Sequence, residues 1–214
     1  MNEILKRIQK IKEIPLFAPF FFCEPIRRNI RLIGSVLLNS SSALVNGTFA
    51  LIYKDPILTS AFIYYFTLLV LRILLFRADK KHQNQEKIKS RAYLVGICVL
   101  AFCVLVALNI FVYNRTIPVR YNISVLIVEG AVFISYFLVM LLRVHRPQNN
   151  DLLTVSVDTL SLSTALYSAF NFLSCLLVSY PFPLGAQLLF FAEIGVVALL
   201  IYISFLLFYK AKSL

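Results

Sequence analysis

Six apolar segments occupy most of the chain, and each is long enough to cross a lipid bilayer. They cover residues 30–53, 57–76, 93–113, 123–142, 152–180 and 184–209. A spanning helix needs about 20 residues, whereas a spanning β-strand needs ~10 residues of alternating polarity. None of the six segments alternates, and a lipid-exposed backbone must satisfy its own hydrogen bonds. The sequence therefore predicts an all-α, polytopic membrane protein with six transmembrane helices in one domain, 29–214.

Basic residues lie mostly on one side of the predicted membrane. Seventeen of the 21 Lys and Arg residues precede the first span, follow the sixth, or lie in the second and fourth loops and their flanks. Positively charged flanks stay in the cytoplasm, so both termini are predicted to be cytoplasmic, in a protein of the cell membrane. This pattern accounts for most of the net charge of +11 and argues against nucleic-acid binding, which needs cations gathered in one patch.

The segment 1–28 precedes the first span and has a different character. Ile4, Leu5, Ile8 and Ile11 recur at helical spacing, with lysine and arginine residues between them. This pattern predicts a short amphipathic helix at the cytoplasmic interface, where it would contact anionic lipid. A weakly ordered tail is the alternative.

An internal repeat suggests how the spans are arranged. The second span, at 62–72, and the fourth, at 133–143, share six of eleven aligned residues, and both end on an arginine. The fourth and sixth spans each carry one acid, Glu129 and Glu193, at similar depth. These likenesses predict three helical hairpins in tandem. Chance matching of apolar residues is the alternative.

The residues that usually bind metals or perform catalysis do not gather in this sequence. Its four cysteines form no CxxC pair, and both histidines, His82 and His145, fall in predicted cytoplasmic loops. No hydrolase, metalloprotease or phosphate-binding motif is present, and the loops are too short for a catalytic domain. We therefore expect no metal, no cofactor and no enzymatic activity.

Polar residues inside the spans form the candidate functional site. An ionisable residue within a membrane costs at least ~2.5 kcal/mol on insertion scales, and such residues tend to be functional. Glu129 and Glu193 are predicted to lie in the outer half of the membrane, with Asn46, Asn109 and Asn171. Five polar groups from five helices would form a cation or proton site. The alternative is that polar stripes on the first and fifth spans only support close helix packing.

A second set of charges lies nearer the cytoplasmic face. Asp158 is at a depth comparable with that of Arg72 and Arg143, which makes an intramembrane ion pair a candidate. The arginines could instead extend to the headgroups, leaving Asp158 to face a water-filled vestibule.

Several segments carry a resemblance to a known family. They are Ala43-Leu44-Val45-Asn46-Gly47, Tyr53, Tyr64-Tyr65 with Arg72, the tyrosine-containing fourth span and the Ser/Thr-rich stretch 161–168. The chain resembles an uncharacterised family of small polytopic membrane proteins of Gram-positive bacteria, a resemblance that implies topology and no chemistry. More distantly, its six-span layout is similar to the membrane domain of cation diffusion facilitators. Those proteins bind metal through Asp and His on their second and fifth helices. Here only Asp158 matches, so no metal transport is implied.

Two functional classes fit these features. The first is a small permease for a cation or solute, in which the intramembrane acids bind the cargo or a coupling ion. The second is a non-transporting membrane partner, such as an immunity, sensory or assembly subunit, that acts through helix–helix contacts. A homodimer or a complex with another membrane protein is expected in either class, although no GxxxG motif specifies one.

Overall fold

The computed structural model describes residues 24–80, 85–113, 121–144, 151–180 and 183–213. Within the helices, the side chains of 24–32, 78–80, 85, 108–113, 141–144 and 186 are outside this description. The amphipathic helix expected near the N-terminus lies outside the described residues, as do the side chains of Asn109 and Arg143.

Six long α-helices make up the described part of the chain. They are α3 (Glu24–Tyr53), α4 (Pro56–Lys80), α5 (Gln85–Tyr113), α6 (Ile123–Val144), α7 (Leu152–Ser179) and α8 (Gly185–Lys212). Each is long and apolar enough to cross a membrane, and the described residues contain no strand. The prediction of an all-α, six-span protein is therefore confirmed, and the chain is a multi-pass membrane protein whose apolar surface contacts lipid.

The helices extend beyond several of the apolar segments that predicted them. α3 begins at Glu24 rather than at residue 30, and α5 begins at Gln85 rather than at residue 93. These added turns are polar and charged, and backbone hydrogen bonding continues a helix past the point where its side chains stop being apolar. The expected N-terminal segment 1–28 therefore overlaps the first helix.

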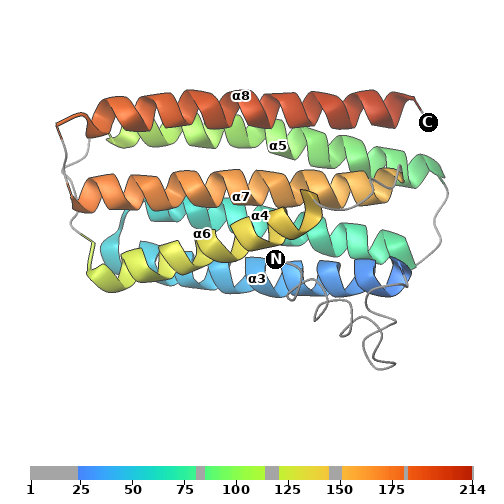
Figure 1. Cartoon of the computed structure of the whole chain (residues 1–214), viewed down its shortest axis with the longest axis horizontal. Coiled ribbons are helices and arrows are strands. Elements are labelled where there is room, and N and C mark those ends of the chain that lie inside the picture. The colour runs from blue at the N-terminus through green and yellow to red at the C-terminus, as the bar shows by residue number, and fades with distance from the viewer. Residues whose placement is uncertain (1–23, 81–84, 114–120, 145–150, 181–182, 214) are drawn as a thin grey trace, which may run out of the picture.

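Successive helices run in opposite directions, so the bundle has two distinct ends (Figure 1). We call the end where α3 begins and α8 stops the terminal end, and the other end the far end. The first residue of α3 and the last residue of α8 lie at the same end of the bundle, as an even number of spans requires. Which side of the membrane that end faces stays a prediction of the charge pattern.

Helix α7 is the centre of the bundle. Buried residues make up 67% of its span, compared with 22–44% in the other five spans. Its neighbours are α6 and α8, which pack along most of its length, together with α4, α5 and a short contact with α3. A helix enclosed on all sides can carry polar residues without exposing them to lipid, and α7 carries many.

The helices do not pair as three tandem hairpins. α3 packs along α4 as expected, but among the described residues α5 packs along α8, and α6 packs along α7 (Figure 1). The hairpin predicted for the third and fourth spans is therefore wrong. The physical reason is that the polar surfaces of α6 and α7 face each other, whereas the partner of α5 is the largely apolar α8.

A glycine on α5 explains how closely α8 approaches. A β-carbon built on Gly96 would lie only 2.3 Å from the ring of Phe208, so a larger residue fits only if this ring shifts. Further along the interface, the Cys103 sulfur lies 3.9 Å from the Val197 carbonyl oxygen. These two contacts set the antiparallel register of α5 and α8.

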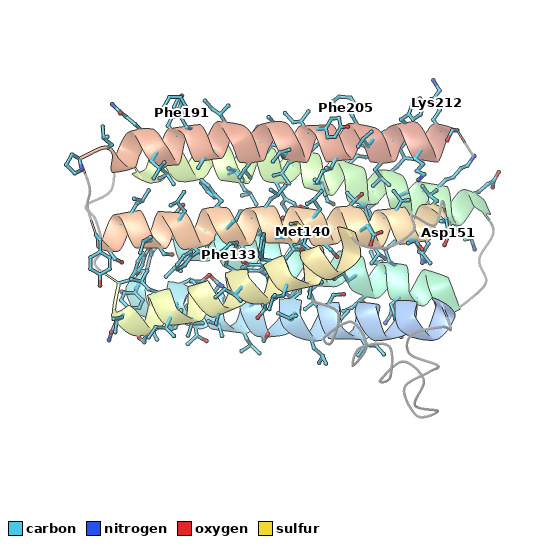
Figure 2. The ribbon with its side chains drawn as sticks, viewed as in Figure 1. Phe133, Met140, Asp151, Phe191, Phe205 and Lys212 are labelled. Atoms are coloured by element: carbon cyan, nitrogen blue, oxygen red, sulfur yellow. The ribbon has the colours of Figure 1, made fainter. Side chains whose placement is uncertain are left out.

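The two sides of α7 differ in chemistry, and we name them for that difference. The polar half consists of α3, α4 and α6 with the side of α7 that faces them. The apolar half consists of α5 and α8 with the opposite side of α7. In Figure 2, Phe191 and Phe205 point outward from α8, on the surface that faces lipid.

Candidate functional site

A carboxylate lies in the middle of the polar half. Glu129 of α6 is fully buried, and its Oε2 accepts a hydrogen bond of 2.7 Å from the side-chain amide of Asn171 on α7. The side chain of Asn46 on α3 lies near enough to interact with the same carboxyl group. Its amide nitrogen also donates to the Ser42 carbonyl oxygen at 3.0 Å. Three helices thus bring together one acid and two carboxamides, as the sequence predicted for these three residues.

Tyr65 of α4 completes this group, which we call the Glu129 cluster: Glu129, Asn46, Asn171 and Tyr65. Tyr65 is fully buried and lies near enough to Glu129 for electrostatic interaction. Four different helices of the polar half therefore contribute one side chain each. The position of Tyr65 was missed by sequence reasoning, although its place in the repeated 62–72 segment was noted.

Four oxygen atoms of the Glu129 cluster have no hydrogen-bond partner among the described residues. They are Glu129 Oε1, Asn46 Oδ1, Asn171 Oδ1 and Tyr65 Oη. Leaving one buried polar atom unsatisfied costs about 1–3 kcal/mol, so native proteins rarely gather several at one place. Such a concentration of unsatisfied oxygen atoms is typical of a site that binds something of positive charge.

The cluster carries one negative charge when Glu129 is ionised. Within the described part of the chain, no basic side chain forms an ion pair with Glu129. No three His, Cys, Asp or Glu side chains of the described residues come together as a metal-binding group. The donors of the Glu129 cluster are one carboxylate, two carboxamide oxygens and one phenol, all of which are hard oxygen ligands.

Four tyrosines, one of which is Tyr65 of the Glu129 cluster, form a layer on the terminal side of Glu129. The rings of Tyr64 and Tyr167 stack at 3.7 Å, and those of Tyr65 and Tyr136 stack at 5.9 Å. Tyr65 also meets Tyr167 edge-on at 6.0 Å. We call Tyr64, Tyr65, Tyr136 and Tyr167 the tyrosine layer.

Hydrogen bonds hold the tyrosine layer to its neighbours. The Tyr136 hydroxyl donates to Asn39 Oδ1 at 2.5 Å and lies 3.2 Å from the Ser42 hydroxyl, which ties α6 to α3. The Tyr64 hydroxyl donates to the Ser163 carbonyl oxygen at 2.7 Å, which ties α4 to α7. The layer is thus a packed and largely satisfied partition across the polar half.

Arg72 lies beyond the tyrosine layer, towards the terminal end. It is only 1% exposed, and its Nη2 donates to the hydroxyls of Thr164 at 3.1 Å and Ser161 at 3.4 Å. Of the two sequence alternatives for this arginine, extension to the headgroups is wrong, because the side chain points into the bundle against α7. Glu129, a buried acid, and Arg72, a buried base, therefore lie on opposite sides of the tyrosine layer.

Asp158 lines a cavity between α7 and α8 together with Lys210. At 100° per residue it lies about 60° around α7 from Ser161 and about 120° from Thr164, the two residues that accept hydrogen bonds from Arg72. The structure therefore brings Arg72 to Ser161 and Thr164, and Asp158 to the side of α7 where Lys210 lies. The intramembrane ion pair stays a prediction.

A further acid closes the polar half at the far end. Asp55 is buried in the turn between α3 and α4, where its Oδ1 accepts from the Ile57 amide at 2.6 Å and caps α4. Its other oxygen accepts from the Tyr121 hydroxyl. Burial raises the pKa of Tyr121, which keeps this hydroxyl protonated and able to donate. Sequence reasoning did not single out Asp55, although an Asp-Pro pair before a helix is a capping signal.

Glu193 lies in the other half of the bundle. It is buried on α8, eight residues after the start of that helix at Gly185. Glu129 lies six residues after the start of α6 at Ile123. Both helices start at the far end of the bundle, so the two acids lie near that end. However, α8 packs against α5 and α7, and α7 separates it from α3 and α6 (Figure 1). The register of α5 and α8 places position 193 level with the turn that contains position 109. The structure therefore brings Asn46, Glu129 and Asn171 together and sets Glu193 apart from them.

Comparison with known proteins adds no relative. The chain matches no protein-family model, no curated protein and no solved structure.

Proposed function

We propose that this protein transports a monovalent metal cation across the membrane and that the Glu129 cluster binds the cation inside the bundle. One observation carries the proposal: a fully buried carboxylate shares its surroundings with two carboxamides and a phenol, and four of their oxygen atoms are unsatisfied. A cation surrounded by these oxygens would replace its hydration shell with protein ligands.

The charge of the cluster favours a monovalent ion. One carboxylate and one Na⁺ or K⁺ together are neutral, whereas a divalent ion would leave a net positive charge buried at a cost of several kcal/mol. A proton would also neutralise Glu129, but the single O–H group that it creates can donate to only one acceptor, so at least one of the amide oxygens of Asn46 and Asn171 would stay unpaired. A metal cation can contact several of these oxygens at once.

The surroundings of the cluster favour a carrier over an open pore. The tyrosine layer separates Glu129 from the terminal end of the polar half, and Arg72 adds a positive charge beyond it. A cation could pass only if the layer opened and Arg72 shifted. Alternating opening at the two ends of the cluster is the behaviour of a carrier.

Ion flux into proteoliposomes that contain the full chain tests the proposal. We would impose gradients of Na⁺, K⁺, Li⁺ and Mg²⁺ in turn, and then a pH gradient alone. The two variants are Glu129→Gln and its matched control Glu193→Gln, which removes an acid of the same type from a similar depth. We expect Glu129→Gln to lower the flux at least about tenfold, which corresponds to ~1.4 kcal/mol of lost cation binding. Glu193→Gln should leave most of the flux intact.

Three results would each contradict a specific part of this proposal. Absence of flux from folded wild-type protein would favour the non-transporting alternative, in which the helices serve a partner protein. Flux that responds only to pH would make the cargo a proton. Equal loss in both variants would mean that the two acids act together despite their separation.

A further inference from the structure

A thin layer of buried side chains lies between the Glu129 cluster and the far end of the polar half. Three of the four helices that build the cluster each add one side chain to this layer, one or two helical turns from their own member of the cluster. These side chains are Leu58 on α4, Val125 on α6 and Cys175 on α7. All three are fully buried and belong to one packed group. We call them the far layer.

Beyond the far layer, Tyr121 and Asp55 meet across the end of the polar half. Tyr121 lies two residues before α6, the helix that carries Glu129, and its hydroxyl donates to Asp55 Oδ2. Its ring packs edge-on against Tyr53 of α3, with the ring centres 5.7 Å apart. Both Tyr121 and Asp55 are buried, and Tyr121 packs in the same group as the far layer. The hydrogen bond therefore joins the start of α6 to the turn between α3 and α4.

Asp55 is the fixed member of this pair. Its Oδ1 accepts from the Ile57 amide at 2.6 Å, and its backbone carbonyl oxygen accepts from the Thr59 amide at 3.0 Å. The preceding residue, Lys54, has a φ of 50°, a conformation that non-glycine residues keep only where their surroundings hold it. Tyr121 is bound to this turn through its hydroxyl. Rotation of its ring would therefore expose Asp55 Oδ2 and leave the cap of α4 in place.

The two ends of the Glu129 cluster are closed by barriers of different kinds. On the terminal side, the tyrosine layer is followed by Arg72, whose positive charge repels a cation. On the far side, Glu129 lies six residues from the start of α6, roughly 9 Å along the helix axis. The far layer and the Tyr121–Asp55 pair occupy this shorter distance, and the carboxylate of Asp55 attracts a cation.

We propose that Tyr121 and Asp55 form the far-side gate of the Glu129 cluster, an inference that rests on the cation-binding function proposed above. In the closed state the Tyr121 hydroxyl occupies Asp55 Oδ2. When the ring turns away, an entering Na⁺ or K⁺ takes the place of the hydroxyl hydrogen at this oxygen. The cation then passes Cys175 of the far layer to reach Glu129. Asp55 thus contacts the cation before Glu129 does, and Tyr121 controls its access.

The rate at which a thiol reagent modifies Cys175 tests this gate. The purified full chain would be treated with a water-soluble, positively charged methanethiosulfonate, and the peptide that contains Cys175 would be followed by mass spectrometry. Cys175 is fully buried, so it reacts only in molecules whose gate is open. We expect slow modification in the wild type and a rate at least about tenfold higher in Tyr121→Phe. This variant leaves Asp55 Oδ2 without its donor in the closed state, which favours opening to water.

Two further variants separate the gate from a general loosening of the far end. Tyr53→Phe removes a hydroxyl from the ring that packs against Tyr121 but leaves the Tyr121–Asp55 hydrogen bond in place, so Cys175 should react at the wild-type rate. Asp55→Asn keeps an oxygen that can cap α4 and replaces the charge-assisted hydrogen bond by a weaker neutral one. It should raise the rate by a smaller factor than Tyr121→Phe does.

The gate is overturned if Tyr121→Phe reacts no faster than the wild type, or if Tyr53→Phe raises the rate equally. If Tyr121→Phe fails to fold, Asp55→Asn decides, and modification at the wild-type rate then overturns the gate. Modification of Cys175 does not require ion transport, so the two proposals fail separately. Faster modification in a protein without flux would contradict cation transport and leave Tyr121 as the gate to a buried cluster. Flux without faster modification would contradict the gate alone.

Discussion

The two halves of the bundle bury acids of the same type in very different surroundings. In the polar half, Glu129 receives a hydrogen bond from Asn171 and lies beside Asn46 and Tyr65. In the apolar half, α5 and α8 meet through aliphatic and aromatic residues, and the hydroxyl of Ser204 donates to the carbonyl of Leu200 in its own helix. Glu193 belongs to this second half.

This difference shows that depth in the membrane is a poor guide to function when taken alone. Glu129 and Glu193 are at similar depth and carry the same chemistry, but among the side chains that the structure describes, polar groups from four helices meet at Glu129 and not at Glu193. A binding site needs convergent donors held by packed elements, and α7 contributes Asn171 to such a group around Glu129. The predictions below test the contrast between the halves.

The largest effect is expected at Asn171. Asn171→Leu keeps the branching and the number of heavy atoms of the side chain but removes the donor to Glu129 Oε2, which leaves a buried carboxylate without its hydrogen bond. We expect the free energy of unfolding to fall by about 2–3 kcal/mol, and cation flux to be lost. Unfolding in mixed micelles with increasing SDS measures the free energy of unfolding.

The control in the apolar half is Ser204→Ala, which should change stability by less than about 0.5 kcal/mol. Equal effects of the two substitutions would remove the distinction between the halves.

A second prediction concerns the packing of the apolar half. Gly96→Ala places a methyl group against the Phe208 ring, and overpacking of this kind costs about 1–3 kcal/mol. The matched control is Gly195→Ala on α8, where a β-carbon meets nothing within 4 Å. We expect that control to be neutral or to stabilise the helix by up to ~1 kcal/mol. Combining Gly96→Ala with Phe208→Leu should recover part of the loss. Absence of any recovery would contradict the pairing of α5 with α8.

A third prediction compares two aspartates at the starts of helices. Asp55→Ala removes the cap of α4 and the acceptor of the Tyr121 hydroxyl, so we expect a loss of about 1–2 kcal/mol in unfolding experiments. Asp151 occupies the equivalent position before α7 but makes no capping hydrogen bond with its side chain. Asp151→Ala should therefore cost clearly less. The reverse order would mean that the turn at Asp55 contributes little to closing the polar half.

The smallest effect is expected in the tyrosine layer. Tyr136→Phe keeps the ring and removes the hydroxyl that contacts Asn39 and Ser42, for an expected loss of about 1 kcal/mol. Tyr202→Phe, on the exposed face of α8, should have no measurable effect on stability. If Tyr136→Phe also leaves stability unchanged while raising flux, the layer acts as a gate more than as a structural tie.

Much of the fold could be predicted from the sequence because lipid imposes a simple rule on length and polarity. The six spans followed from apolar segments of about 20 residues or more. The pairing of the helices did not follow, because apolar residues on α5 and α6 say little about which neighbour each helix meets. The decisive features were the missing side chain of Gly96 and the polar surface of α7, whose partners are visible only in three dimensions.

The candidate site was predicted in part. Counting residues along each span placed Asn46, Glu129 and Asn171 at one level, and the structure brings these three together. The same counting included Glu193, because the depth of a residue along its helix does not say which other helices lie beside it. Asp55 was overlooked for a related reason, since a loop residue is assumed to be exposed until a partner such as Tyr121 is seen.

The measurement that tests the central claim most directly is the unfolding temperature of the purified protein in NaCl or KCl, compared with choline chloride at equal ionic strength. A cation that binds only the folded state stabilises it by RT ln(1 + [L]/Kd), or about 2.7 kcal/mol at a concentration of 100 Kd. We predict a cation-dependent rise for the wild type and for Glu193→Gln, and no rise for Glu129→Gln. A rise that persists in Glu129→Gln, or one that disappears in Glu193→Gln alone, would contradict the assignment of the cation site to the polar half.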